Sequence, residues 1–515
     1  MRLAELVGAL SLAADLGLGQ PMEHVARSCL LACRLGSQAG AGEAERAALY
    51  YVALLGWVGC IADSHDDAMR FGDDLTYRAG VYDVDMKPLP FLGYLLRRAG
   101  TGGSPARRAR VGAQLLATGA SSVQESLHAH CQVTASIAAR LGMGPEVCEP
   151  LGQIFARWDG KGLPAGVGGE QVALPVRLWH IADVAEVHHR RGGVQAAVDV
   201  ARQRYGSQFD PTLVEQFSAC AEELFAGLPD GSSWDELVAA EPALHRELTE
   251  QELDSALTVL ADYADLKSPY MRGHSRGVAE LCRAAAPLVG VNAEGVRTLW
   301  RAALVHDLGR TGVPNTIWDK PGPLTPIERE RVRMHSYYTE RMLSRPHRLA
   351  EIGAVAALAH ERLDGSGYHR GLTGAAIPMS GRLLAAADHY HGMLESRAHR
   401  EPVPPRTAAQ RLVDEAKAGR MDPTAVDAVL ASAGLRPARR PAGVAGLTGR
   451  EVEVLVLLAS GASNRQIARR LGIAPKTAGN HIERIYAKAG VSTRAAATMF
   501  AMQHGLLSRL VTIDQ

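Results

Sequence analysis

The sequence is poor in aromatic residues, has no paired cysteines and carries almost no net charge. Aromatic side chains make up 5% of the 515 residues, while alanine, leucine, valine and arginine abound, which favours helix over strand. A net charge of +1 excludes a polycation, so any nucleic-acid surface must be local. The seven cysteines form no CxxC pair, which excludes a zinc ribbon and a disulfide framework and indicates core residues in a reducing compartment.

Long apolar runs are also missing. Glu5 and Asp15 interrupt the apolar N-terminal segment, which therefore resembles an amphipathic helix more than a signal peptide. The apolar run Tyr51–Ala62 is too short to span a bilayer. We expect a cytoplasmic protein without a membrane partner.

Two turn-rich stretches divide the chain. Residues 228–233 read LPDGSS, and residues 436–443 carry two prolines and three arginines ahead of a new helical pattern. We therefore predict all-α domains at 1–230, 248–435 and 444–515, with 436–443 as a linker.

The first two domains look like copies of one another. Residues 157–166 match 362–371 at an offset of 205, which also maps His130 onto His335 and Asp183 onto Asp388. Upstream the offset is 250, and His24 maps onto His274. The change in offset predicts an insertion of about 45 residues in the first copy, between Gly59 and His130.

The last segment shows four short helices in series. Thr448 and Ser463 each begin a capping box, Gly472 ends the second helix, and Pro475 suits the first position of the third. The third helix runs to Gly490, and a fourth follows, capped by Ser492 or Thr493 and ended by Gly505. Basic residues outnumber acidic ones from Leu447 onward, as DNA phosphates require.

The segment LTGREVEVLVLLASGASNRQIARRLGIAPKTAGNHIERIYAKAGVSTR resembles the LuxR/NarL-type helix-turn-helix domain. The resemblance implies a homodimer on double-stranded DNA, with the helix from Pro475 to Ala489 in the major groove. Lys476 and Thr477 would contact phosphates, and Gly479, Asn480 and Glu483 would face base edges. The predicted interface also includes Arg484 and Lys488. Ala474 replaces the usual serine cap, at a cost of about 1 kcal/mol.

Histidine and aspartate recur across the middle domain in a pattern that suits transition-metal ions. The candidates are His274, the adjacent pair His306 and Asp307, His335, His360 and Asp388. Imidazole and carboxylate are ligands of first-row metals, and an aspartate can bridge two ions. The two members of an adjacent pair point in different directions, so each can serve a different ion.

These residues stand in motifs that resemble the HD-GYP family of HD-superfamily phosphohydrolases. The matching segments are HDLGR at 306–310, KPGPLT at 320–325, HERLDGSGY at 360–368 and the surroundings of Asp388. The family implies an all-α bundle, a centre of one or two iron or manganese ions, and hydrolysis of cyclic di-GMP. His274, His306, Asp307 and Asp388 would hold one metal. Asp307, His335 and His360 would hold the other.

The resemblance also assigns roles around the metals. Asp307 and Arg310 would take part in catalysis, Arg310 standing where the family usually has a lysine. Gly365, Gly367 and Tyr368 would shape the ligand-binding loop. The sequence departs from the family at Ala359, which removes one ligand. Tyr270 stands where some members have a carboxylate, and His369 stands in place of a proline. His391 is a further departure. His369 and His391 are interpreted either as partly exposed polar residues or as substitute ligands.

The first copy keeps His24, His130 and Asp183 but loses the rest of the pattern. Gly56 and Trp57 occupy the place of the His-Asp pair, and Phe155 that of His360, so we expect no dinuclear centre there. The tripeptide at 65–67 (HDD) reads as a solvated loop. A structural or dimerisation module and a ligand-sensing pocket both remain open for this copy.

Three functions follow from the sequence. The chain is a DNA-binding regulator with an active phosphodiesterase block, or a regulator whose inactive HD block only senses a ligand or partner. The third, a standalone phosphohydrolase, is disfavoured by the completeness of the helix-turn-helix pattern.

Overall fold

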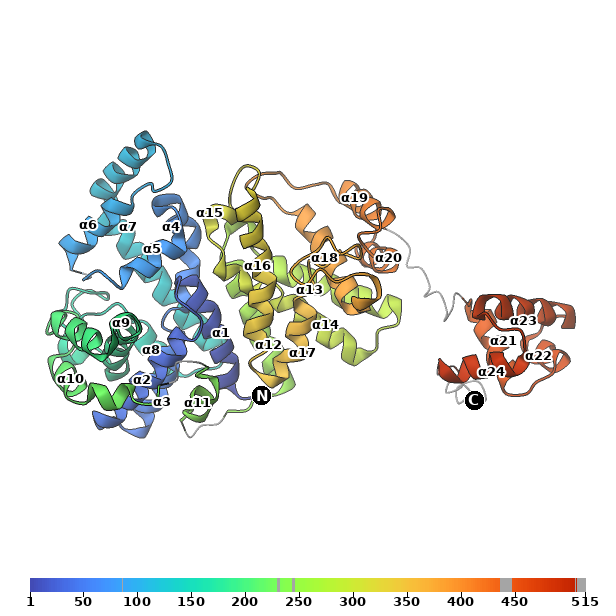
Figure 1. Cartoon of the computed structure of the whole chain (residues 1–515), viewed down its shortest axis with the longest axis horizontal. Coiled ribbons are helices and arrows are strands. Elements are labelled where there is room, and N and C mark those ends of the chain that lie inside the picture. The colour runs from blue at the N-terminus through green and yellow to red at the C-terminus, as the bar shows by residue number, and fades with distance from the viewer. Residues whose placement is uncertain (86, 229–231, 243–245, 436–446, 505, 507–515) are drawn as a thin grey trace. The chain divides into compact units, whose positions relative to one another are not determined.

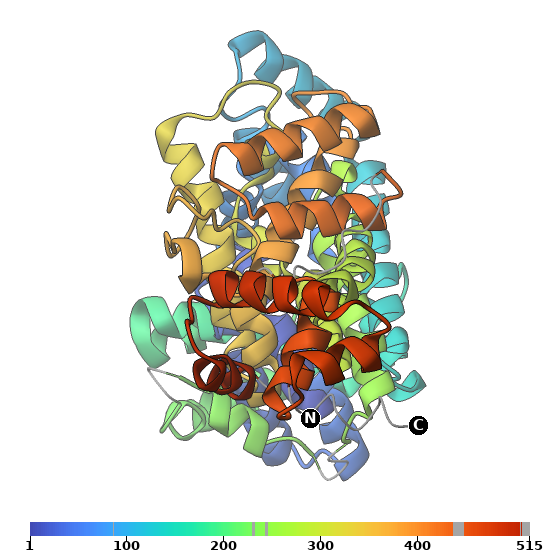
Figure 2. The ribbon, with the colours of Figure 1, turned by 90° about the vertical axis from the view of Figure 1, so that its right-hand side faces the viewer.

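The computed structural model describes residues 1–85, 87–228, 232–242, 246–435, 447–504 and 506. Every regular element in these ranges is helical and none is a strand, as Figures 1 and 2 show, so the all-α prediction is confirmed. The described residues form two compact units. The first comprises Met1–Pro287 and Val291–Leu435, so the two predicted HD-type domains pack together, and the second includes the helices after residue 446.

The first copy is a bundle in which α2 packs against α3 and α9. Its elements are α1 (Leu3–Gly17), α2 (His24–Gln38), α3 (Glu43–Leu55), η1 (Val58–Asp63), α4 (Ser64–Phe71), α5 (Asp74–Val81), α6 (Pro88–Arg98), α7 (Pro105–Arg140), α8 (Pro145–Leu151), η2 (Gly169–Gln171), α9 (Leu174–Gln203), α10 (Pro211–Phe225) and α11 (Trp234–Ala239).

The second copy repeats this arrangement, with α13 packed against α14 and α18. Its elements are α12 (Glu250–Asp265), η3 (Pro269–Met271), α13 (His274–Ala285), η4 (Ala286–Val289), α14 (Ala293–Val305), η5 (Leu308–Gly312), α15 (Asn315–Trp318), α16 (Pro326–Leu343), α17 (His347–Ala356), η6 (Gly374–Ala376), α18 (Met379–Leu394), α19 (Pro405–Lys417) and α20 (Pro423–Ser432).

Backbone contacts confirm the duplication at both offsets. Asp15 accepts a hydrogen bond from the backbone N–H of Val25, and Asp265 accepts the matching one from Ser275, 250 residues later. A Cβ built on Gly59 would lie 2.3 Å from the carbonyl oxygen of His130, and one on Gly309 would lie 2.0 Å from that of His335. Both copies therefore need glycine where η1 or η5 crosses the following long helix.

The insertion in the first copy builds α5, α6 and the first part of α7. Phe71, Tyr94, Leu95, Ala99 and Leu115 form a separate small core there. The tripeptide at 65–67 lies on α4, not on a solvated loop as expected: Asp67 is buried against Arg78, and His65 Nδ1 lies 2.8 Å from Asp319 Oδ2 of the second copy. The expectation failed for His65 because Asp319 lies 254 residues away in the sequence.

A buried polar network joins the two copies. Lys267 of the second copy and Asp74 of the insertion are both fully buried, with Nζ 2.7 Å from Oδ2. The other carboxylate oxygen of Asp74 accepts a 2.7 Å hydrogen bond from the backbone N–H of Asn315, the first residue of α15. The insertion thus holds the segment that leads into the second copy's cavity.

One stretch in the first copy, Glu43–Phe71, is long and apolar enough by composition to cross a membrane. In the folded chain 72% of its most apolar window is buried inside the protein, where it supplies core side chains.

The C-terminal unit comprises α21 (Gly449–Ala459), α22 (Asn464–Leu471), α23 (Pro475–Ala489) and α24 (Arg494–Gln503). The capping boxes at Thr448 and Ser463 are present, and Thr493 caps α24. Its core lies among all four helices. The expected stop at Gly505 lies outside the described residues.

Candidate metal centre and DNA-binding helix

Six side chains from several helices and the segments that join them meet inside the second copy. His274 begins α13, His306 ends α14, and Asp307 precedes η5. The remaining three are His335 on α16, His360 after α17 and Asp388 on α18. The structure thus brings together all six residues that the sequence singled out for metal binding.

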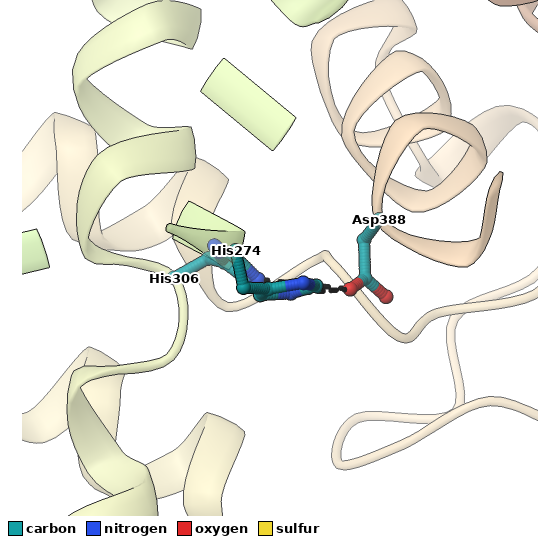
Figure 3. A group of neighbouring side chains, drawn as sticks. All are labelled: His274, His306 and Asp388. Carbon is teal, nitrogen blue, oxygen red and sulfur yellow. Dashed lines mark ion pairs between the residues drawn. The ribbon is translucent and has the colours of Figure 1, made fainter. Parts of the chain in front are cut away.

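The first cluster consists of His274, His306 and Asp388, whose ligand atoms all lie within 4.8 Å of one another. Figure 3 shows both imidazole rings directed at the Asp388 carboxylate. Asp388 Oδ1 lies 3.2 Å from His274 Nε2 and 3.7 Å from His306 Nε2. Asp307 Oδ2 also lies 3.7 Å from each of these two nitrogens.

The second cluster consists of Asp307, His335 and His360. Asp307 Oδ1 lies 3.4 Å from His335 Nε2, while its other oxygen faces the first cluster. His360 Nδ1 lies 3.3 Å from Asp388 Oδ2. Asp307 and Asp388 therefore both stand between the clusters, which is the position of bridging carboxylates.

Burial and opposite charges together set the protonation of these groups. Burial disfavours both carboxylates in their charged form. Even so, His306 and Arg310 hold the pKa of Asp307 well below its usual range, and His360 and His274 do the same for Asp388. Burial also opposes the charge on His274, but Asp388 and Glu395 raise its pKa to about 10. Burial lowers the pKa of His360 to about 3 and keeps it neutral, as a ligand must be.

Hydrogen bonds on the far side of the rings orient the imidazoles. His306 Nδ1 donates to the carbonyl of Ala303 at 2.7 Å, and His335 Nδ1 donates to that of Val332 at 2.5 Å. His274 Nδ1 lies 2.9 Å from Glu395 Oε2. Such partners fix the ring so that Nε2 faces a metal. Sequence reasoning missed Glu395, although it follows Asp388 by two helical turns and so shares its face.

The donor set fits a divalent transition metal. Within the described ranges, His306 Nε2, His335 Nε2 and Asp307 Oδ1 are buried atoms without a hydrogen-bond partner. Nitrogen and carboxylate donors that converge without satisfying one another are typical of a ligand set. The first cluster offers two imidazoles and up to two carboxylates, and the second offers two imidazoles and the bridging Asp307.

A cavity of about 780 Å³ opens onto the two clusters and is rich in cationic side chains. Its basic lining residues are Lys320, Arg310, Arg362, Arg397, Arg400 and Arg411. The Arg310 guanidinium lies 3.6 Å from the centre of the Trp318 ring and 3.5 Å from Asp307 Oδ2. Trp318, which the sequence analysis did not single out, therefore holds Arg310 beside the clusters.

The loop after α17 closes one side of this cavity. The Tyr368 ring stacks on His360, with centroids 4.9 Å apart and planes 17° from parallel. A Cβ on Gly367 would lie 2.4 Å from the backbone nitrogen of Arg362, and Gly365 has a φ of +80°. Buried Glu361 accepts hydrogen bonds from the backbone of Arg370 and Leu372, so it supports the loop.

The residues that depart from the family pattern differ in their burial and in their contacts. Ala359 is a buried core residue. His369 is half-buried, with Nε2 3.1 Å from Glu340 Oε2. His391 is half-buried beside Glu395, and His274, His391 and Glu395 form a third group whose ligand atoms lie within 4.8 Å of one another. Tyr270 lines the cavity rim.

The first copy fills the corresponding place with an indole. Trp57, at the position of Asp307, donates from Nε1 to Asp183 Oδ1 at 2.8 Å. His130 Nε2 lies 2.8 Å from the carbonyl oxygen of Gly56, and burial lowers its pKa to about 4. His24 lies between Asp183 and Glu186, at 3.3 and 2.5 Å. Of the inherited side chains, His24 and Asp183 are thus paired with each other, and His130 is bonded to the backbone.

The predicted recognition helix, α23, presents a polar exposed face. Lys476, Thr477, Asn480, Glu483 and Arg484 are exposed, and Ala478, Ile482 and Ile485 face the core. A Cβ on Gly479 would meet open space. Ala474 makes no side-chain cap, as expected. Lys488 donates to Glu451 at 2.7 Å, so it also serves the fold of the domain.

An all-α bundle that gathers His, His-Asp, His, His and Asp around one cavity defines an HD-type phosphohydrolase domain, here followed by a helix-turn-helix. Family models agree. Residues 258–425 match the HD domain, and residues 445–501 match the bacterial regulatory proteins of the luxR family.

Relatives cover both copies. The 3′3′-cGAMP-specific phosphodiesterase 3 of Vibrio cholerae is 30% identical over 78% of this chain and 88% of its own length. A crystal structure of a cyclic GMP-AMP-specific phosphodiesterase of V. cholerae covers 85% of this chain and 99% of that chain, with a TM-score of 0.59 and 27% identity. A cyclic di-GMP phosphodiesterase of Thermotoga maritima is 36% identical over 34% of this chain and 47% of its own length. The chain therefore belongs to the HD-GYP family of HD-domain proteins, and it adds a LuxR-type DNA-binding domain.

Proposed function

We propose that the second copy hydrolyses a cyclic dinucleotide, and that this activity is coupled to DNA binding by the C-terminal domain. The observation that carries the proposal is the pair of donor clusters at the floor of one cationic cavity. A cyclic dinucleotide presents two phosphodiesters and two bases, which suit arginines and an aromatic ring. The relatives named above are phosphodiesterases of cyclic di-GMP and of 3′3′-cGAMP.

The two clusters would hold one or two divalent ions, and the mixed imidazole and carboxylate donors favour iron or manganese. Such an ion supplies Lewis acidity, which generates a nucleophile from water near neutral pH and neutralises charge on phosphoryl oxygens. His274, His306, Asp307 and Asp388 form the more complete set. His335 and His360 complete the second set with Asp307.

The chain's own residues bind and orient the substrate. Hydrolysis joins a water oxygen to phosphorus, breaks one ester P–O bond, and leaves a proton on the departing ribose oxygen. Arg310, held over Trp318, is placed to bind a phosphate next to Asp307. Tyr368, stacked on His360, supplies an aromatic face at the edge of the cavity.

A second function, ligand sensing without turnover, is favoured by one observation. Ala359 contributes no donor, so within the described residues the second cluster consists of Asp307, His335 and His360, with Asp388 shared from the first cluster. A weakly held second metal would leave binding intact and slow the chemistry.

The DNA-binding part of the proposal rests on the exposed face of α23. A homodimer would place two such helices on two half-sites, in the cytoplasm where the DNA is accessible. Lys476 and Arg484 supply phosphate contacts, while Asn480 and Glu483 supply base contacts. We propose that cyclic-dinucleotide occupancy of the second copy changes the affinity for DNA.

The test is turnover by the full chain. Purified protein is loaded with Mn(II) or Fe(II), incubated with cyclic di-GMP or 3′3′-cGAMP, and its linear products are counted. We expect turnover that vanishes in Asp388→Ala and persists in Asp235→Ala, which removes an exposed carboxylate on α11. Tight binding with no product from either substrate would select the sensor function. Neither binding nor turnover would refute both.

A further inference from the structure

The first copy encloses a cavity of about 710 Å³ at the place that corresponds to the metal centre. Trp57, Phe155 and Trp179 line it where the second copy has Asp307, His360 and Leu384. Pockets that bind small molecules measure about 300–1,000 Å³ and are mostly apolar. Loss of the metal ligands has therefore left a space of ligand size with a new chemical character.

The insertion supplies an aliphatic wall that has no counterpart in the second copy. Leu92 and Leu95 come from α6, and Leu115, Leu116 and Val123 come from α7. Leu116 is 66% exposed, so it marks the side on which the cavity opens to solvent. The insertion thus adds a wall without closing the entrance.

Cationic groups gather at another part of the lining. Arg157 and Lys161 belong to the loop after α8, and Arg204 and Gln208 follow at the end of α9. A hydrogen bond from Trp158 N to Gln208 O joins these two segments. Burial lowers the pKa of Arg204, and the nearby Arg157 lowers it further.

Two buried hydrogen-bond donors in this lining have no acceptor among the described residues. Arg157 is 5% exposed and pairs with Asp159 through Nε and Nη2. Its Nη1 has no hydrogen-bond partner in the described residues, and Asp85 Oδ1 lies 3.7 Å from it, beyond hydrogen-bond distance. The same holds for Nε1 of Trp179, which is 1% exposed. Buried donors of this kind are normally satisfied, so both call for an acceptor from a ligand.

We propose that the first copy is a binding site for a small amphiphile with an aliphatic body and a single anionic group, such as a carboxylate. The body would lie along the leucines of α6 and α7, and the anion would accept hydrogen bonds from Arg157. This site is separate from the proposed phosphodiesterase site.

The comparison with the second cavity argues against a cyclic dinucleotide in the first. Six basic side chains line the second cavity, beside two metal-ligand clusters. In the first cavity Arg78 is paired with Asp67, and Arg157 is partly neutralised by Asp159 and, at 3.7 Å, by Asp85. With Lys161 and Arg204, the first cavity has four basic side chains against the six of the second, so it suits one anionic group better than two phosphodiesters.

Binding is measured on the full chain after delipidation, with dodecanoate as the probe and dodecan-1-ol as its uncharged match. Calorimetry and quenching of tryptophan fluorescence both report occupancy, since Trp57 and Trp179 line the cavity. We expect one dodecanoate per chain, and binding of dodecanol weaker by about 10- to 100-fold, the range for one hydrogen bond to a charged group. Arg157→Met should bring dodecanoate down to the level of dodecanol, whereas Arg362→Met, the matching change in the second copy, should leave it unchanged.

A second pair of variants keeps the test valid if Arg157→Met fails to fold. Leu116→Glu places a negative charge at the exposed entrance and should weaken dodecanoate binding, while Leu116→Lys should not. No saturable binding, or binding indifferent to both Arg157 and Leu116, would overturn the proposal. So would cyclic di-GMP binding that survives Asp388→Ala and is lost in Arg157→Met. Turnover in the second copy is a separate readout, so either proposal can fail alone.

Discussion

Removal of the ammonium group from Lys267 tests how the two copies are held together. Its side chain and that of Asp74 are both fully buried, with Nζ and Oδ2 2.7 Å apart. In Lys267→Met, the Asp74 carboxylate stays buried and keeps the backbone N–H of Asn315 as its remaining hydrogen-bond partner among the described residues. Breaking a buried ion pair from one side costs about 3–5 kcal/mol, because an unpaired charge remains.

A change at Asp74, the partner of Lys267, shows whether the loss of stability comes from the unpaired charge or from altered packing. Burial lowers the pKa of Lys267 even though Asp74 opposes the shift, so the pair itself is costly to desolvate. The double variant Lys267→Met, Asp74→Asn leaves no buried charge and should recover most of the loss. Lys417→Met removes a 68% exposed partner of Asp414 and should change the free energy of unfolding by less than about 1 kcal/mol.

Urea denaturation followed by circular dichroism at pH 7 gives these free energies. Turnover gives a second readout, since Asn315 begins the short helix that ends at Trp318, the residue under Arg310. We expect Lys267→Met to lower turnover more than Lys417→Met does. A loss below about 1 kcal/mol for Lys267→Met, or a double variant no more stable than the single one, would refute the reasoning.

Three further predictions concern the separate parts of the chain. Gly309→Ala forces a Cβ against the carbonyl of His335, so it should lower the free energy of unfolding by about 1–3 kcal/mol and reduce the metal content measured by mass spectrometry. Its counterpart Gly59→Ala should lower the free energy of unfolding as much and leave the metal content unchanged. Equal metal loss in the two variants would contradict this. Burial opposes the charge on His24, but Glu186 raises the pKa of His24 from about 6.5 to about 10 in the folded chain. The charged imidazole therefore contributes fully to the stability of the fold below about pH 6.5, and this contribution is lost as the pH rises through about 10. The thermal midpoint should fall over that range, and it should fall less steeply in His24→Gln. Lys476→Ala should weaken DNA binding and reduce the slope of log K against log salt by about 0.9; an unchanged slope removes this residue from the phosphate contacts.

The parts of the structure that could be predicted from the sequence are those marked by local motifs or by an internal repeat. Capping boxes at Thr448 and Ser463 depend on residues three positions apart, and the structure has them. The six histidines and aspartates of the second copy stand within motifs, so their convergence could be expected before any contact was known. Repetition at two fixed offsets likewise revealed the insertion.

The rest depends on contacts between segments that are far apart. Lys267 lies in a polar stretch next to Ser268 and Pro269, which resembles an exposed turn, and only Asp74, 193 residues away, makes it a buried residue. His65 was misplaced for the same reason, because its partner Asp319 belongs to the other copy. Nothing in the local pattern around Trp318 indicates that its ring lies under Arg310.

The two copies together show which interactions the bundle needs. Asp15 and Asp265 cap the same backbone position in each, although the metal-ligand groups among the described residues all belong to the second copy. In the first copy an indole at Trp57 bonds to Asp183 in place of an ion. We therefore expect the bundle to close through backbone contacts and apolar packing, and to keep its fold when the metal is removed.

Metal removal should accordingly separate activity from folding. In the metal-free second copy the protonated His274 lies between Asp388 and Glu395, so part of the carboxylate charge is compensated. We expect chelation to abolish turnover and to leave the helical circular dichroism almost unchanged. Metal affinity should rise with pH, because binding must displace the proton from His274. Loss of helix on chelation would mean that the second copy, unlike the first, depends on its metal to fold.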